Sequence, residues 1–80
     1  MIIAGKGILV DTASYAIRLE DCCDIVAYGR GKKAFILGRY WPEEYADHVF
    51  RELQGAAVEG KAAYILPESN IRAGGNNAEP

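Results

Sequence analysis

The residues of this chain best suited to chemistry are cations set among glycines and aromatic side chains. The first group is the run Gly29-Arg30-Gly31-Lys32-Lys33. Glycines allow a tight turn, and the backbone amides of such a turn, together with the cations Arg30, Lys32 and Lys33, can hold a phosphate. The run lacks the spacing of a Walker phosphate loop. A solvated hairpin tip without a ligand is therefore the alternative interpretation.

A second group, Arg39-Tyr40-Trp41, places a guanidinium beside two aromatic rings. Arginine with flat rings is a good combination for a nucleobase and its phosphate. The same residue types also anchor protein–protein interfaces, and the two rings can equally serve packing alone. The predicted ligand-binding set has six members and needs no cofactor: Arg30, Lys32, Lys33, Arg39, Tyr40 and Trp41.

No residue pattern predicts catalysis or a metal site, and we expect a protein that is not an enzyme. His48 is the only histidine, and no nucleophile or orienting partner accompanies it. Neighbouring residues of a strand point to opposite faces, so an ordinary disulfide between Cys22 and Cys23 is not expected. Four acidic residues lie near one another in the sequence but lack the spacing of a calcium-binding loop, so solvated loop positions are predicted for them: Asp11, Glu20, Asp21 and Asp24.

Size and charge narrow the class of protein. Eighty residues make one domain near the lower limit for independent folding, and self-association would bury more apolar surface. The formal charge of −2 argues against a dedicated DNA- or RNA-binding protein. No apolar run has the length of a membrane span, and the N-terminus lacks a basic leader. With the cysteines read as reduced, a cytoplasmic protein is expected.

Short strands and one helix must position these residues. Apolar and alternating runs predict strands near residues 2–3, 8–10, 15–19, 23–28 and 34–37. Pro42 then opens an amphipathic helix that ends at Gly55 or Gly60, and a last strand over 63–66 stops at Pro67. The predicted class is α+β: a small antiparallel β-meander or sheet of four to six short strands, packed by one amphipathic α-helix.

The domain limits follow from the same patterns. We expect a single domain over residues 1–68 and a flexible C-terminal tail over residues 69–80, which is polar and rich in glycine. One helix covers only one face of a small sheet. The second face, with Val26 and Tyr28 or their neighbours, and the sheet edges would stay open. A homo-oligomer is therefore expected.

Three motifs follow one another along the chain. They are Leu37-Gly38-Arg39-Tyr40, the helical series Glu44, Ala46, Val49 and Leu53, and the series Gly60, Tyr64, Pro67 and Glu68. Together they resemble a family of small, mostly uncharacterised proteins of Firmicutes and their phages, over residues 1 to about 69. One departure is Trp41, where the family usually has a serine or threonine helix cap worth roughly 1 kcal/mol.

The resemblance implies a function by analogy. Some small β-rich phage proteins counter bacterial defence by sequestering nucleotide immune signals as oligomers, and others block a defence protein directly. The leading hypothesis is a non-catalytic phage or mobile-element anti-defence protein that binds a small anionic nucleotide-like ligand as a homo-oligomer. The alternative is a protein–protein inhibitor whose acidic helix or exposed sheet edge docks on a defence or regulatory protein.

Overall fold

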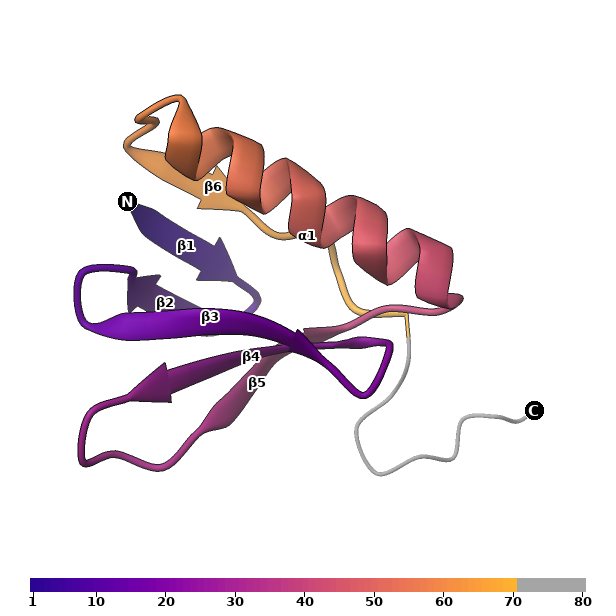
Figure 1. Ribbon diagram of the computed structural model, residues 1–80, viewed down its shortest axis with the longest axis horizontal. Coiled ribbons are helices and arrows are strands. Elements are labelled where there is room, and N and C mark those ends of the chain that lie inside the picture. The colour runs from indigo at the N-terminus through magenta and orange to yellow at the C-terminus, as the bar shows by residue number, and fades with distance from the viewer. Residues whose placement is uncertain (71–80) are drawn as a thin grey trace.

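The computed structural model describes residues 1–70, which form six strands and one helix (Figure 1). The predicted α+β class, with four to six short strands packed by one helix, is confirmed. The predicted tail lies outside the described residues from residue 71 onward. The elements are β1 (Ile2–Gly5), β2 (Ile8–Asp11), β3 (Tyr15–Glu20), β4 (Asp24–Gly29), β5 (Phe35–Arg39), α1 (Glu43–Val58) and β6 (Ala63–Ile65).

The strands form two three-stranded sheets. β3, β4 and β5 follow in chain order as antiparallel neighbours, whereas the second sheet has the order β2-β1-β6. In that sheet β1 lies antiparallel to β2 and parallel to β6. A parallel pair needs a long crossover, here supplied by α1 and everything before it. The sequence patterns predicted each strand but not this division, because no local signal specifies a pairing between the two ends of the domain.

α1 buries a stripe of residues at spacings of three and four: Ala46, Val49, Leu53 and Ala56. The helix runs through Gly55 and ends before Gly60, whose φ of +76° is favourable for glycine. The amide of Gly60 donates to the carbonyl of Ala57, and that of Lys61 donates to Ala56. These two bonds make a Schellman end. The predicted stop at Gly60 is confirmed.

The start of α1 differs from the expectation. Pro42 occupies the N-cap rather than the first helical turn, and no side chain caps the helix. Trp41 therefore precedes the cap and does not stand in the capping position that the resemblance assigned to it. Glu43 and Glu44 lie in the first turn, near the positive end of the helix dipole. Within residues 1–70, no helix combines the length and apolar character needed to cross a membrane.

The core lies between α1 and the inner faces of the two sheets (Figure 1). Its largest fully buried side chains are Tyr40, Ile3, Ile25 and Val49. The first four residues of β4 are buried, so that part of the strand is covered on both faces.

The outer face of the β3-β4-β5 sheet is partly covered by side chains of its own. Arg18 lies over the ring of Tyr28, 5.4 Å from its centroid, and the hydroxyl of Tyr28 donates to Glu20. Val26 is buried on this sheet. Ile36, which pairs with Val26 on β5, is however 41% exposed. Of the two reasons given above for a homo-oligomer, the uncovered face therefore holds only in part, and the sheet edges remain.

A more exposed apolar surface lies on the β2-β1-β6 sheet. Ala4 of β1 lies opposite Leu9 of β2 and opposite Ile65 of β6. Leu9 is 74% exposed and Ile65 is 77% exposed. We call these three residues the outer row. In the described part of the chain, β2 and β6 are edge strands on either side of it.

Candidate ligand-binding groove

A groove of about 520 Å³ lies between the two sheets. Its wall is formed by Gly5 at the end of β1, Lys6 in the turn that follows and Ile8 of β2. β5 contributes residues 36–39, and the chain after β6 contributes residues 66–70. Within residues 1–70, β5 pairs with β4 alone, so its second edge has no neighbouring strand. The groove is therefore a gap where two sheets approach without pairing.

Residues 66–70, which we call the strap, tie the two sheets together. At one end the amide of Leu66 donates to the carbonyl of Ala4 at 2.8 Å. At the other end, the amide of Arg39 donates to Ser69 Oγ at 2.9 Å, and the amide of Asn70 donates to the carbonyl of Arg39 at 3.1 Å. Ser69 and Asn70, which composition assigned to the tail, are hydrogen-bonded to the domain.

The side chain of Asn70 also fixes the residue before the helix cap. Its Oδ1 accepts from the amide of Trp41 at 2.7 Å, and its Nδ2 donates to the carbonyl of Trp41 at 2.6 Å. These two hydrogen bonds join the backbone of Trp41 to the strap, although Trp41 itself does not line the groove.

A buried carboxylate orients Arg39. The Nε of Arg39 donates to Asp24 Oδ1 at 3.0 Å, and its Nη2 donates to Asp24 Oδ2 at 3.5 Å. Asp24 is buried, while Arg39 is half-buried and lines the groove. The hydrogen bond to Asp24 and the charge of that carboxylate raise the pKa of Arg39 above its ordinary value. The guanidinium is therefore a permanent cation held in a fixed orientation.

Lys6 supplies a second cation to the groove. Its Nζ lies 3.5 Å from Glu68 Oε2, and both side chains are largely exposed. Exposed pairs of this kind contribute about 1 kcal/mol or less, so an incoming anion can displace the carboxylate at little cost. The sequence patterns did not single out Lys6. The signal was present, because Gly5-Lys6-Gly7 repeats the glycine–cation–glycine order of residues 29–31.

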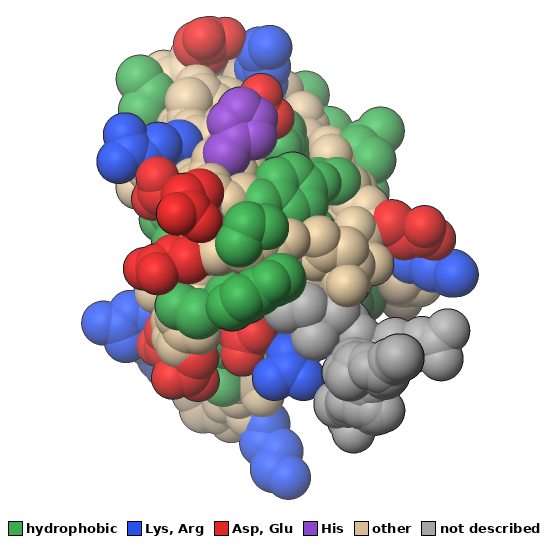
Figure 2. All heavy atoms as spheres, turned by 90° about the vertical axis from the view of Figure 1, so that its right-hand side faces the viewer, with side chains coloured by type: hydrophobic (Ala, Val, Ile, Leu, Met, Phe, Trp, Pro, Cys, Tyr) green, Lys and Arg blue, Asp and Glu red, His purple; other side chains and the backbone are tan. Residues whose placement is uncertain are grey.

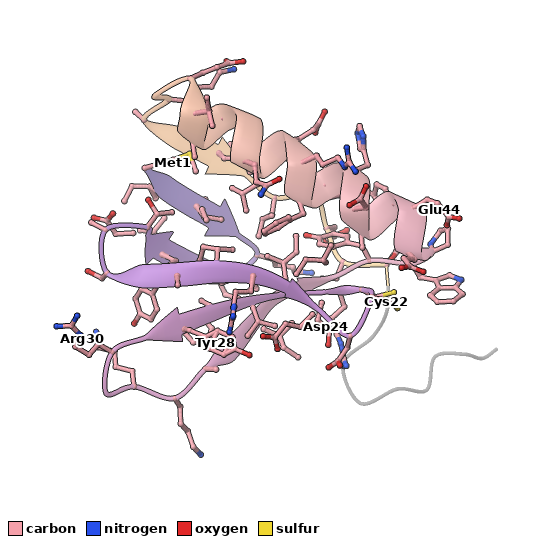
Figure 3. All side chains as sticks on the ribbon, viewed as in Figure 1. Met1, Cys22, Asp24, Tyr28, Arg30 and Glu44 are labelled. Carbon is pink, nitrogen blue, oxygen red and sulfur yellow. The ribbon has the colours of Figure 1, made fainter. Side chains whose placement is uncertain are left out.

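The structure separates the hairpin cations from the groove. Arg30, Lys32 and Lys33 are exposed at the turn between β4 and β5 and do not line the groove. Figure 3 shows Arg30 and Asp24 at opposite ends of this hairpin. The six residues of β4 span roughly 17 Å at about 3.3 Å per residue. These three cations and Arg39 therefore do not form one site within this chain.

The two aromatic residues of the predicted set have different positions. Tyr40 is fully buried; its hydroxyl donates to the carbonyl of Pro67 at 2.8 Å, and its ring meets that of Tyr45 edge-on. A ligand cannot stack on it, so its predicted binding role is replaced by a packing role. Trp41 is 60% exposed. Of the predicted set, Arg39 lines the groove, whereas Trp41 does not and is joined to the strap only through its backbone.

The residues considered for catalysis or metal binding lie elsewhere. His48 is exposed on α1, and its Nε2 is 3.4 Å from Glu52. Cys22 lies in the turn before β4, with φ +62°, and not in a strand. The argument that its side chain points away from that of Cys23 is therefore wrong. Across residues 1–70, no three His, Cys, Asp or Glu side chains are grouped to hold a metal ion.

Comparison of the chain with protein-family models, with curated proteins and with solved structures finds no match.

Two buried groups make the protein sensitive to alkali. Burial, followed by the charges of the neighbouring tyrosines, raises the pKa of Tyr40 from 10.0 to about 12. Burial, followed by the neighbouring Cys22 and acidic residues, raises the pKa of Cys23 from 9.0 to about 11. A raised pKa in the folded state means that folding favours the protonated form. The stability from these groups is thus complete below pH 9 and is lost as the pH rises toward 12.

We therefore expect the free energy of unfolding, measured by urea titration, to fall between pH 9 and pH 12. At roughly 1.4 kcal/mol per pKa unit, Tyr40 alone contributes about 2–3 kcal/mol when fully titrated. A Cys23→Ala variant is expected to lose less stability than wild type between pH 9 and pH 11. A urea midpoint that stays constant through this range would contradict the burial of both groups.

Proposed function

We propose that this chain is a non-catalytic binding protein that holds a small, planar, anionic ligand of the nucleotide class in the groove between its sheets. The supporting observation is the guanidinium of Arg39, fixed on Asp24 and lining the groove that Lys6 also lines. The proposed site retains Arg39 from the predicted set and adds Lys6, whereas Trp41 does not line the groove.

The groove has the size and chemistry of a small-molecule site. About 520 Å³ falls within the range of roughly 300–1,000 Å³ typical of such sites. A phosphate matches the fork of an arginine and the point charge of a lysine. Apolar side chains from three segments of the lining suit a flat ring: Ile8, Ile36 and Leu66. Because Asp24 offsets the charge of Arg39, the affinity for an anion depends strongly on Lys6.

The proposal extends to assembly and biological role. The outer row and its two edge strands support self-association, since exposed apolar side chains and unpaired strand edges both favour contact with another chain. In this proposal the assembled protein sequesters a nucleotide immune signal in the bacterial cytoplasm on behalf of a phage or mobile element, as the resemblance implies.

Binding is tested by thermal unfolding with nucleotides, cyclic dinucleotides and the corresponding nucleosides. A phosphorylated ligand at a hundred times its Kd is expected to add about 2.7 kcal/mol of stability, which raises the Tm by roughly 10 °C or more for a domain of this size. The unphosphorylated nucleosides are expected to have no effect. Lys6→Gln is expected to remove at least about half of the shift because it deletes the displaceable cation.

The matched control is Lys33→Gln, the same charge change at the hairpin tip. It is expected to keep the full Tm shift. An equal loss of the shift in both variants would contradict binding in the groove and would indicate diffuse attraction of the anion to cationic side chains. Absence of a shift with every phosphorylated compound contradicts the proposal. Native mass spectrometry of protein taken from cells then reports the subunit number and any retained molecule, and Leu9→Lys is expected to give monomers.

A second candidate, a protein–protein inhibitor, is favoured by the same outer row, which a partner protein can cover in place of another copy. In that case Leu9→Lys abolishes stoichiometric co-purification of the partner, while no nucleotide changes the Tm.

A further inference from the structure

Two free thiols meet in the turn between β3 and β4. Cys22 is exposed and Cys23 is buried in the core. Their sulfur atoms lie 2.8 Å apart, less than 1 Å beyond the length of about 2.0 Å of a covalent S–S bond. Adjacent cysteines in an extended strand would point to opposite faces instead.

The backbone of the turn produces this approach. Asp21 and Cys22 have φ angles of 52° and 62°, in the left-handed region that residues with a side chain rarely adopt. The amide of Cys23 closes the turn by donating to the carbonyl of Asp21 at 2.7 Å and to that of Glu20 at 3.2 Å. Unusual backbone conformations of this kind persist where the surrounding structure holds them, often at functional sites.

The exposed sulfur opens into an acidic hollow. Cys22 lines a pocket of about 430 Å³ together with Leu19 and three carboxylates of the first turns of α1, Glu43, Glu44 and Asp47. Figure 3 shows Cys22 below the start of the helix, where Glu44 lies. The space-filling view of this side shows acidic side chains gathered next to hydrophobic ones (Figure 2). A cationic reagent is attracted to such a pocket and an anionic one is repelled.

We propose that Cys22 and Cys23 form an oxidisable dithiol whose oxidant is a cationic low-molecular-weight disulfide. The thiolate of Cys22 attacks one sulfur of that disulfide, so that a mixed disulfide forms and one small thiolate leaves. The sulfur of Cys23 then attacks the sulfur of Cys22, the mixed disulfide breaks and a second small thiolate leaves. The two protein thiols lose two electrons, the reagent gains them, and the two protons pass to the departing thiolates.

Exposure and burial assign the two roles. Cys22 is reached from solvent, whereas Cys23 is enclosed by the core. Burial, the hydrogen bond with Cys22 and the nearby charges of Cys22, Asp24 and Glu43 raise the pKa of Cys23 to about 11. Cys23 is therefore a poor first nucleophile. In the second step its partner sulfur is already in contact, and this proximity favours ring closure over attack by a distant thiol.

The reaction is followed by intact-mass spectrometry of the reduced full chain mixed with cystamine, a dicationic disulfide. Wild type is expected to pass through a transient adduct to a product that lacks two hydrogens and carries no adduct. Cys23→Ala is expected to stop at one stable adduct. Cys22→Ser is expected to react at least about tenfold more slowly while folded, because the remaining thiol is buried. Circular dichroism verifies that each variant folds.

Charge selectivity is tested with oxidised glutathione, an anionic disulfide. The rate ratio of cystamine to oxidised glutathione is measured for the folded chain and for the chain unfolded in urea, which cancels the intrinsic reactivity of the two reagents. The folded ratio is expected to exceed the unfolded one by about fivefold or more at low ionic strength and to decrease as salt is added. Glu44→Gln is expected to lower the folded ratio, whereas Glu59→Gln, near the other end of α1, is expected to keep it.

Four results would each overturn the proposal. They are a stable adduct as the end product of wild type, disulfide-linked dimers on a non-reducing gel, undiminished reactivity of Cys22→Ser, and equal effects of the two glutamate substitutions. None of these measurements involves Lys6 or Arg39, so failure here leaves the binding proposal to its own test.

Discussion

Replacing Gly38 with alanine is expected to lower the free energy of unfolding by roughly 3 kcal/mol, because it overpacks a rigid part of the core. A Cβ at this position would meet the hydroxyl of Tyr40 and lie 2.7 Å from its Cζ and 2.8 Å from its Cε2. The ring cannot give way easily. It is fully buried, and its hydroxyl donates a hydrogen bond to the carbonyl of Pro67. The ring of Tyr45 also packs against it edge-on, with 5.6 Å between the ring centroids.

The effect is measured by urea unfolding against a matched glycine. A Cβ at Gly5 would lie 3.6 Å from Leu66 Cδ1, an ordinary van der Waals contact, so Gly5→Ala is expected to cost less than about 1 kcal/mol. Adding Tyr40→Leu to the Gly38→Ala chain is expected to cost less than the sum of the single changes, because the two positions compete for the same space. Equal destabilisation by the two alanine variants would contradict the packing described here.

Removing the guanidinium of Arg39 is expected to cause the second largest decrease in the free energy of unfolding. Arg39→Met leaves the buried carboxylate of Asp24 without its partner, and breaking a buried pair costs about 3–5 kcal/mol. The side chain of Arg39 is 33% exposed, so solvent screens part of that loss and we expect about 2 kcal/mol. The double variant Asp24→Asn/Arg39→Met removes both charges and is expected to recover part of the stability.

The coupling is measured as a double-mutant cycle by urea unfolding, with a coupling energy of about 1 kcal/mol or more expected for groups in contact. Arg51→Met provides the control. It breaks a closer ion pair, Arg51 Nε to Asp47 Oδ2 at 2.7 Å, but both side chains are more exposed than those of the Arg39–Asp24 pair, at 75% and 46%. Its cost is expected to be about 0.5 kcal/mol or less. Additive effects at Asp24 and Arg39, or an equal loss in the control, would show that burial does not strengthen this pair.

The elements of the fold could be predicted because their signals are local. Alternation marked the strands, spacing of three and four marked α1, and two glycines, Gly55 and Gly60, marked the alternatives for its end. A register shift occurs beside Gly38, where Ile25 pairs with Gly38 and Val26 pairs with Ile36. That the ring of Tyr40 needs this position to be glycine could not be predicted, since it depends on the final packing.

The groove and its residues were only partly predictable, because they too depend on the final packing of the chain. Neighbouring aromatic residues alternate between faces of an extended chain, but only the tertiary structure decides that Tyr40 is buried and Trp41 exposed. Asp24, fifteen residues from Arg39, looked like part of a solvated acidic loop. Composition assigns Asn70 to the flexible tail, because composition carries no information about its hydrogen bonds to Trp41.

The parallel pairing of β1 with β6 has a consequence for synthesis of the chain. β3, β4 and β5 can pair with one another soon after they leave the ribosome, because their contacts are between neighbours in sequence. β1 and β2 have only each other at that time, and a two-stranded hairpin is marginal in water. The emerging chain therefore carries an incomplete sheet until Ala63–Ile65 has also left the ribosome, and long-range pairings of this kind form late and slowly.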